Sequence, residues 1–182
     1  LAVSQGTTAK AALIPTNTTD ATFDLGQTGN GLTVIIDVDD DGADTATWTS
    51  ARAVSAGSGL SISDLDGDTL TLKIDGGAVQ TITFTVAAVD AAAAAAEIND
   101  QLVGGSAVVN SGEIDIYSDL YGTDSIVEIT GGTGATELGQ AVAVNTEATS
   151  DAANCSAATI AEIKTWLEAG ITGSSGITVT DL

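Results

Sequence analysis

Short segments of alternating apolar and polar residues, each bounded by a turn rich in Asp and Gly, dominate this chain. The cleanest are Leu70–Ile74 and Val79–Val86, which the sequence Asp75-Gly-Gly77 separates. A period of two places one face of a β-strand in a core, and a Gly-containing turn of about three residues joins two strands into a hairpin. Ile82 and Phe84 then share the buried face of the second strand. Such a pattern restricts the fold to small antiparallel sheets.

Several other segments alternate in the same way or are rich in β-branched residues, and most are bounded by turn residues. The strands expected from them are Thr22–Leu25, Leu32–Val38, one or two within Thr45–Ser55, Ala107–Val109, Glu113–Tyr117, Ser125–Thr130, Ala141–Thr146 and Ile177–Thr180. The last of these breaks off at the end of the printed sequence, which suggests a fragment of a longer protein.

Two segments change to a helical period. Asp90 is placed to cap a helix that continues to about residue 103, where Gly104-Gly105 ends it. Thr159-Ile-Ala-Glu162 fits a capping box, in which the hydroxyl and the carboxylate bond each other's backbone amides, and it starts a second helix that runs to Ala169. Both helices contain Ala-Glu-Ile, which indicates a repeated strand–helix–strand module about 65 residues apart.

The expected fold class is therefore α+β and mostly β, with antiparallel, sandwich-like modules and two short helices packed on them. We expect residues 1–22 to form an extended N-terminal arm. Residues 23–146 are expected to form a β-rich domain with one helix at about 90–103. Residues 147–182 are expected to form a second strand–helix–strand element, as part of a repeat or of a truncated domain.

The chemistry that the chain can perform is limited by its side chains. It has no His, one Cys, four Lys/Arg and 25 Asp/Glu, with a formal net charge of −21. His, Lys and Cys are the groups that titrate, attack or ligate near neutral pH, so we expect no enzyme and no cofactor. Such a charge repels nucleic acid and anionic membranes, and no apolar run reaches the roughly 18 residues of a membrane span. We expect neither nucleic acid binding nor membrane insertion.

The strongest candidate for a ligand site is an acidic turn at residues 37–45. Asp37, Asp39 and Asp41 occupy alternate positions, and Gly42 and Asp44 follow them. This order matches the start of a calcium loop, whose oxygens converge on a hard cation. Trp48 stands where an EF-hand has its bidentate Glu, so this is not an EF-hand. The two interpretations are a looser Ca²⁺ site, shared with Asp64, Asp66 and Asp68, and a solvated acidic turn, which we favour.

Other candidate residues have simpler interpretations. Cys155 is expected to be a small buried hydrophobe rather than a reactive thiol or an interchain bridge. Trp48 and Trp166 are expected to fill a core poor in large side chains rather than to stack on sugars. The sequences at Asn17 and Asn154 match glycosylation acceptors by chance. The acids Glu113, Asp115 and Asp119 could pair as in a glycosidase, but acids that alternate along a strand usually form its solvated face.

One stretch of the chain resembles a known module. Its order of segments resembles a module of bacterial flagellar hook-associated and cap proteins, which recurs in structural proteins of tailed bacteriophages. The segments are Ile82–Val86, the Ala-rich helix from Asp90 to Asn99, Val108–Ile116, Gly122–Ile129 and Gly134–Gly139. The resemblance implies a helix packed on a small antiparallel sheet and a turn at Gly122–Ser125 between two strands.

An earlier stretch is similar to phage virion repeats of the decoration, fibre or tail type. It comprises Thr28–Val34 and Ala56–Ile62, and the two resemblances together cover roughly residues 25 to 140. The chain lacks the long heptad helices that flank the module in flagellar cap proteins, which favours a phage particle. No catalytic residues carry over, because the module is not enzymatic.

The function expected from these observations is that of a structural component of a tailed-phage particle, located in the virion. Its partners would be copies of itself, in a homo-oligomer, and other virion structural proteins. The alternative is a bacterial cell-surface adhesin or filament subunit, extracellular and stabilised by Ca²⁺.

Overall fold

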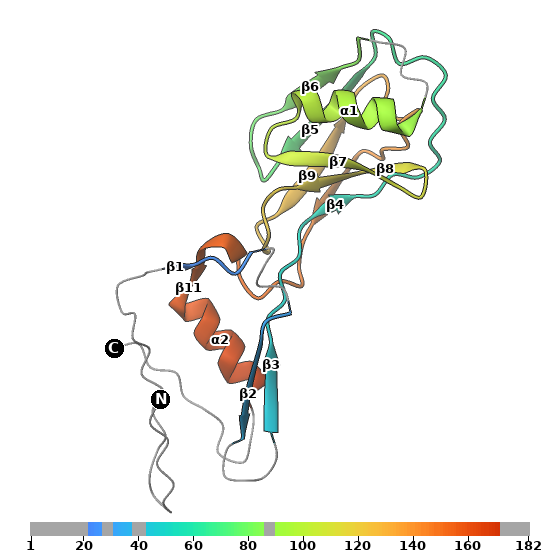
Figure 1. The fold of residues 1–182 in the computed structure, drawn as a ribbon. Helices are drawn as coiled ribbons and strands as arrows, with labels where there is room; N and C mark the ends of the chain where they lie inside the picture. Colours follow the sequence, from blue (N-terminus) through green and yellow to red (C-terminus); the bar gives the residue numbers. More distant parts are fainter. Residues whose placement is uncertain (1–21, 27–30, 38–42, 86–89, 172–182) are drawn as a thin grey trace, which may run out of the picture.

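The computed structural model describes residues 22–26, 31–37, 43–85 and 90–171. These residues form two lobes joined by a narrow neck (Figure 1). Each lobe has its own cluster of buried apolar side chains. The described residues are mostly β, with several antiparallel sheets and two α-helices, which confirms the expected fold class.

The upper lobe contains two antiparallel sheets that enclose one core. The first sheet has the order β10-β9-β5-β6, and the second has the order β4-β8-β7. Their strands are β4 (Val54–Ser55), β5 (Thr69–Ile74), β6 (Gln80–Thr83), β7 (Gly105–Asn110), β8 (Glu113–Ser118), β9 (Ile126–Gly131) and β10 (Ala143–Thr146). Leu70, Leu72 and Ile82 are fully buried, as the alternation of β5 and β6 predicts.

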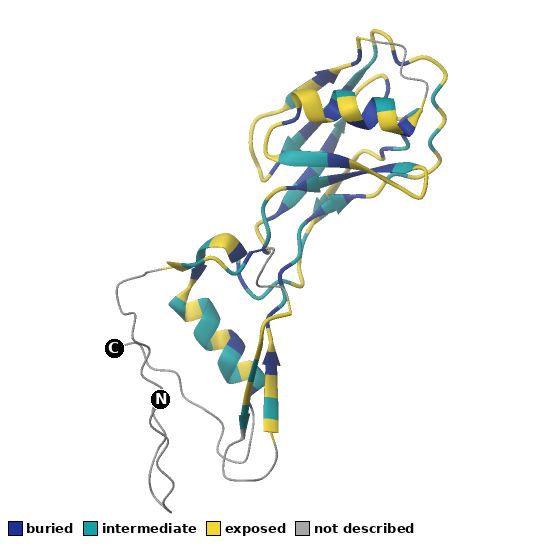
Figure 2. Cartoon of the chain, in the orientation of Figure 1, coloured by how far each residue is buried: buried dark blue, intermediate teal, exposed yellow. Residues whose placement is uncertain are grey.

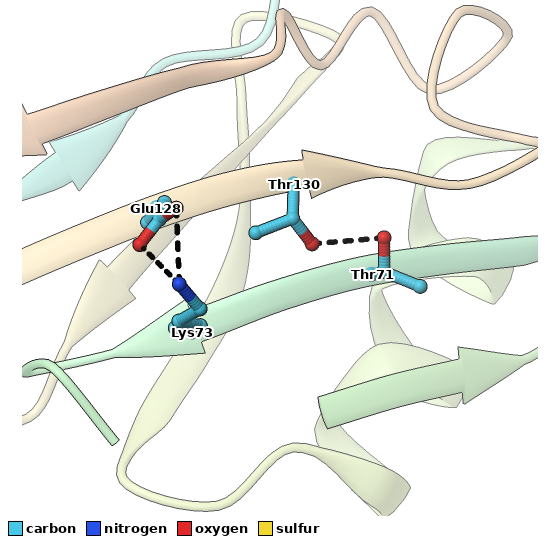
Figure 3. Close-up of polar contacts among 4 residues, drawn as sticks. All are labelled: Thr71, Lys73, Glu128 and Thr130. Atoms are coloured by element: carbon cyan, nitrogen blue, oxygen red, sulfur yellow. Dashed lines mark hydrogen bonds and ion pairs between the residues drawn. The ribbon is translucent and has the colours of Figure 1, made fainter. Parts of the chain in front are cut away.

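The outer face of the first sheet carries polar pairs between neighbouring strands. Lys73 forms an ion pair with Glu128, and the Thr130 hydroxyl donates to the Thr71 hydroxyl at 2.9 Å (Figure 3). The register between β5 and β9 shifts beside Thr71, where a β-bulge leaves Thr130 as the extra residue.

Helix α1 (Ala91–Gln101) connects β6 to β7 and lies across the open side of the upper lobe (Figure 1). The Asp90 side chain accepts a hydrogen bond from the Ala93 amide, which confirms the predicted N-cap. The stripe that contains Ala94, Ala95 and Ile98 is buried, and the opposite side faces solvent (Figure 2). Small side chains on this stripe let the helix approach the strands closely.

The lower lobe is built from segments far apart in the sequence. Its elements are β1 (Thr22–Phe23), β2 (Thr33–Asp37), β3 (Ala43–Thr47), the 3₁₀ helix η1 (Cys155–Ala157), β11 (Ala158–Thr159) and α2 (Ile160–Gly170). Strand β1 pairs with β11, and α2 lies beside the β2–β3 hairpin (Figure 1). The capping box predicted at Thr159 and Glu162 is present.

Two tryptophans form the centre of the lower core. Trp48 and Trp166 meet edge to face, with ring centroids 5.3 Å apart, and Cys155 is buried beside them in the same cluster. Trp48 also donates a hydrogen bond from its indole nitrogen to the Leu25 carbonyl. A Cβ on Gly170 would lie 2.5 Å from the Ala46 Cβ, so α2 can approach β3 this closely only with Gly at that position.

Three segments of the chain meet at the neck, and backbone hydrogen bonds join them. Asp151 bonds Thr49 twice, through its backbone amide and through its carboxylate, which accepts from the Thr49 amide at 2.6 Å. Gly122 donates to the Ala51 carbonyl, and Thr123 donates to Ala152. The turn at Gly122–Ser125 does stand between two strands, β8 and β9, but these strands belong to different sheets.

The two core clusters group the chain differently from the expected boundaries at residues 23 and 147. Residues in the range 25–48 pack with residues 152–171, whereas the upper cluster is drawn from residues 53–138. Pattern along the sequence shows where a strand lies but not which distant segment covers it. The expected arm at 1–22 falls almost wholly outside the described residues, as does the strand expected at Ile177–Thr180.

Candidate functional site

Carboxylates throughout the described chain accept hydrogen bonds from backbone amides. This use of acids explains how a chain with few cations keeps many negative charges in an ordered fold, since a backbone amide stabilises the charged form of a carboxylate. The amide–carboxylate pairs that join distant segments are Thr49–Asp151, Gly57–Asp115, Leu60–Glu113, Ser63–Glu137, Thr85–Glu97, Ile126–Asp75 and Ala153–Glu162.

The acids of β8 hold structure in place. Asp115 is only 5% exposed and accepts from the Gly57 amide, the Asn110 side chain and the Tyr117 hydroxyl. This corrects the expectation that the acids of this strand form a solvated face. A Cβ on Gly57 would lie 2.4 Å from the Ile114 carbonyl oxygen, so Gly lets the chain cross close over β8 and cover Asp115.

Burial, and then the Asp115 carboxylate, raise the pKa of the Tyr117 hydroxyl, while the Arg52 guanidinium opposes this rise. Arg52 lies over Tyr117, 4.4 Å from the ring centroid, and 5.5 Å from the ring of Tyr121. One of the few cations therefore contacts aromatic rings beside the neck. No sequence motif indicates this cluster, whose only signal is an isolated Arg in a chain with two Tyr.

The acidic turn predicted to bind Ca²⁺ lies mostly outside the described residues. Asp37 ends β2 and Asp44 lies in β3, while Asp39 and Asp41 fall in the interval that is not described. Within the described residues no three His, Cys, Asp or Glu side chains gather in a group that could hold a metal ion. The calcium site at Asp37, Asp39, Asp41 and Asp44 stays a prediction.

The other acids considered for that site lie elsewhere. Asp64, Asp66 and Asp68 surround Leu65, which belongs to the core of the upper lobe, whereas β2 and β3 are in the lower lobe (Figure 1). The Asp64 carboxylate bonds the Asp66 amide within its own turn. The strand residues Asp37 and Asp44 therefore lie in a different lobe from Asp64, Asp66 and Asp68.

The remaining predictions concern single residues in several parts of the fold. Cys155 is fully buried, and Trp48 and Trp166 fill the lower core, as predicted. The Asn154 side chain accepts from the Ser156 amide and so caps η1, and Asn17 lies outside the described residues. Asp119 is exposed at the end of β8, where its backbone amide donates to the Gly104 carbonyl.

Two side-chain amides of helix α1 form hydrogen bonds with the backbone of an edge strand, one in each upper sheet. Asn99 both donates to and accepts from the backbone of Ala107 in β7. Gln101 does the same with the backbone of Thr83 in β6. A carboxamide offers one acceptor and a pair of donors, so each of these side chains substitutes for a residue of a neighbouring strand. Strands β6 and β7 are thus partly protected from pairing with another chain.

Strand β10 is the other edge of the first sheet, and no strand of the described residues pairs with its outer side. Val142 and Val144 are 69% and 60% exposed, and Ala141 and Ala143 are also exposed. Residues Ala141–Thr146 carry no charge, and charge is one common protection of an edge strand. The sequence signal was the uncharged run Ala-Val-Ala-Val, which predicts a strand without showing that it is an edge. We call Ala141–Thr146 the open edge.

Comparison of this chain with protein-family models, with curated proteins and with solved structures found no match. The interpretation of the site therefore depends on the chain's own residues. Among these features, the open edge is the one that could bind another chain through backbone hydrogen bonds alone.

Proposed function

We propose that this chain is a structural subunit of a tailed-phage particle, as a capsid decoration, fibre or tail protein located in the virion. It acts through contacts with copies of itself and with other virion structural proteins. The observation that carries the proposal is the open edge, an exposed and uncharged strand whose outer side is unpaired among the described residues. An edge of this kind is a template for a further strand.

The use of the acidic side chains supports the same proposal. Seven carboxylates link distant segments by accepting backbone amides, so they contribute to the fold. The remaining acids leave a strongly negative surface, which opposes non-specific association and leaves specific strand pairing as the route to assembly.

The choice of a phage particle over other assemblies depends on the resemblance of Ile82–Gly139 to the module shared by flagellar and phage structural proteins. The two α-helices described here have 11 residues each, far shorter than the heptad helices of flagellar cap proteins. Within the described part of the chain, no helix has both the length and the apolar character needed to cross a bilayer.

The first experiment measures the assembly state directly. Sedimentation velocity over a hundredfold range of protein concentration, followed by electron microscopy, is expected to show a regular oligomer. A chain that stays monomeric and folded throughout this range would contradict the proposal. Oligomers of irregular size would contradict it as well, because virion components assemble with defined symmetry.

The second candidate function is a cell-surface adhesin or filament subunit stabilised by Ca²⁺. It is favoured by the placement of Asp37 and Asp44 on the two paired strands that flank the remaining acids of the turn. The test compares Tm in CaCl₂ and in EDTA. A rise of several degrees with Ca²⁺ that Asp39→Asn and Asp41→Asn both abolish supports this candidate. The matched control is Asp66→Asn, in the upper-lobe turn, and it should leave the response unchanged.

A further inference from the structure

The open edge differs from the other edge of the same sheet in what covers it. Strand β6 at the far edge is bonded by the Gln101 side chain, and Gln80 in β6 bonds both backbone groups of Val103. At the open edge, the described hydrogen bonds of strand β10 to other strands go to β9. Val144 is paired with Glu128, so it lies on the outer face of the sheet beside the Lys73–Glu128 ion pair. An added strand would lie next to Val144.

We propose that the open edge is occupied by the N-terminal segment of a neighbouring copy, within residues 1–19, which adds a strand beside β10. This inference rests on the proposed function, because it names the partner through which the subunit assembles. The occupant is thus a second copy of this chain, and the contact is a head-to-tail exchange in which each copy supplies one segment and accepts another.

The N-terminal segment differs from the rest of the chain in its net charge. Residues 1–19 contain Lys10 and no Asp or Glu, whereas residues 20–182 contain three Lys/Arg and 25 Asp/Glu, a net charge of −22. The three cations of the described chain are already engaged, Arg52 with two Tyr, Lys73 with Glu128 and Lys164 with Glu168. Attraction between the N-terminal segment and an acidic subunit therefore favours this contact.

The length of one run in the segment fits the site. Thr7–Ile14 is a run of eight residues between Gly6 and Pro15 that contains neither Gly nor Pro. A run of this length matches a strand, and Pro at its end would stop further pairing because Pro has no backbone donor. Fully extended, residues 15–21 reach at most about 25 Å, which allows the run to leave its own subunit.

Pairing of two open edges with each other is the main alternative, and charge disfavours it. Each copy carries a formal net charge of −21. Glu128 beside Val144 is paired with Lys73, but Glu147 follows Thr146 directly, so a symmetric contact would bring the Glu147 side chains of both copies toward one seam. The N-terminal segment brings Lys10 to the same seam instead.

Photo-crosslinking between distinguishable copies tests the inference. A full-length chain with Val144→p-benzoylphenylalanine is mixed with an unmodified, ¹⁵N-labelled chain, irradiated as the assembled protein, and digested for mass spectrometry. The expected crosslinks join residue 144 to residues 1–19 of the labelled chain. Val103→p-benzoylphenylalanine is the matched control, because Val103 is 74% exposed but its backbone is bonded by Gln80, and it should give no such crosslinks.

Each result has a defined meaning. Crosslinks from residue 144 to residues 141–146 of the labelled chain establish edge-to-edge pairing and overturn the inference. Crosslinks only to residues 1–19 of the same chain overturn it too, because the segment then folds back. An assembled protein that gives no crosslink from residue 144 overturns the inference and leaves the proposed function intact. A protein that sediments as a monomer overturns both.

Substitutions give a second measurement that does not depend on crosslinking. Lys10→Glu and Val144→Glu are each expected to weaken association at least about tenfold in sedimentation equilibrium, equivalent to about 1.4 kcal/mol. Lys164→Glu makes the same charge change in the lower lobe, and Val103→Glu makes the same change at another exposed Val; both should alter association less than about threefold. Equal effects of the paired variants would overturn the inference. Circular dichroism identifies any variant that fails to fold.

Discussion

The two lobes are stabilised by different kinds of contact. The core of the upper lobe is drawn from residues 53–138, a continuous stretch in which neighbouring strands form hairpins. The lower core joins residues near 25–48 to residues 152–171, so its contacts close a loop of about 100 residues. That loop is the upper lobe itself. Closing it costs little entropy only when the upper lobe is already folded.

This difference predicts an order of stability. The upper lobe should fold without the lower one, whereas the lower lobe should need the upper one to bring its two halves together at the neck. Regions with few local contacts open at lower free energy than the most stable core.

The largest effects come from truncating one buried residue in each core. Trp48→Ala and Leu72→Ala each remove a fully buried side chain, at a cost of about 3–5 and 2–5 kcal/mol respectively. In hydrogen exchange measured by mass spectrometry, Trp48→Ala should expose amides of the lower lobe only. Leu72→Ala should reduce protection in both lobes. Loss of the upper lobe in Trp48→Ala would show that the dependence runs the other way.

The next effect concerns the edges that α1 closes. Asn99→Ala leaves a partly buried backbone donor and acceptor of β7 without their partner, at a cost of about 1–3 kcal/mol. Gln101→Ala leaves exposed groups of β6 that water can reach, at a cost of about 0.5–1.5 kcal/mol. Asp100→Ala lies between them and is exposed, and its effect should stay within about 0.5 kcal/mol. Urea unfolding provides the measurement. Three equal effects would mean that the amides do not stabilise the edges.

A smaller effect depends on pH and belongs to the lower lobe. Burial would raise the pKa of Glu162, but hydrogen bonds from Ala153 and Thr159 outweigh it, and the pKa lies below its usual value. A carboxyl with a lowered folded-state pKa stabilises the fold above its unfolded pKa, and this stability is lost as pH falls through the folded value.

Glu162→Gln should therefore destabilise the protein at pH 7 and match the parent near pH 3. The difference at pH 7 should be below about 1 kcal/mol, since solvent screens this partly exposed group. Urea midpoints at pH 7, 4.5 and 3 provide the comparison. A difference that persists unchanged to pH 3 would assign the loss to packing instead of charge.

The smallest expected effects are those of the ion pairs, one in each lobe. Lys73–Glu128 joins two strands of the upper lobe, and Lys164–Glu168 joins two turns of α2. Both are partly exposed, so double-mutant cycles should give about 0–1 kcal/mol for the first and about 0.3–0.5 kcal/mol for the second. Coupling energies that do not decrease in 1 M NaCl would contradict a screened charge interaction.

Local sequence signals predicted the elements but not their partners. Asp90, Thr159 and Glu162 act as caps because capping involves residues only three apart, and the β5–β6 hairpin follows from its own turn. The pairing of β1 with β11 joins residues more than 130 positions apart, and no local pattern encodes it. The same holds for Asp115, whose burial depends on the chain that crosses over it at Gly57.

The candidate site was predictable only in part. The run Ala141–Val144 predicts a strand, but its place at the edge of a sheet follows from the order β10-β9-β5-β6, which mixes early and late strands. The acidic turn, by contrast, stands out in the sequence, and the fold places its flanking residues Asp37 and Asp44 in a different lobe from Asp64–Asp68. Composition identified which side chains were rare, and the structure shows that the three cations among the described residues contact aromatic rings or acids.

The chain enters the upper lobe near Ala53 and leaves it near Thr146, and both positions lie next to the neck (Figure 1). The upper lobe is thus an insertion in the lower one, with its entry and exit side by side. A compact domain whose own termini are adjacent could be grafted at this point if residues 121–124, which bond Ala152, Ala153 and Cys155 of the lower lobe, are kept. The upper lobe could then be exchanged while the lower lobe is kept, which would suit the display of foreign domains.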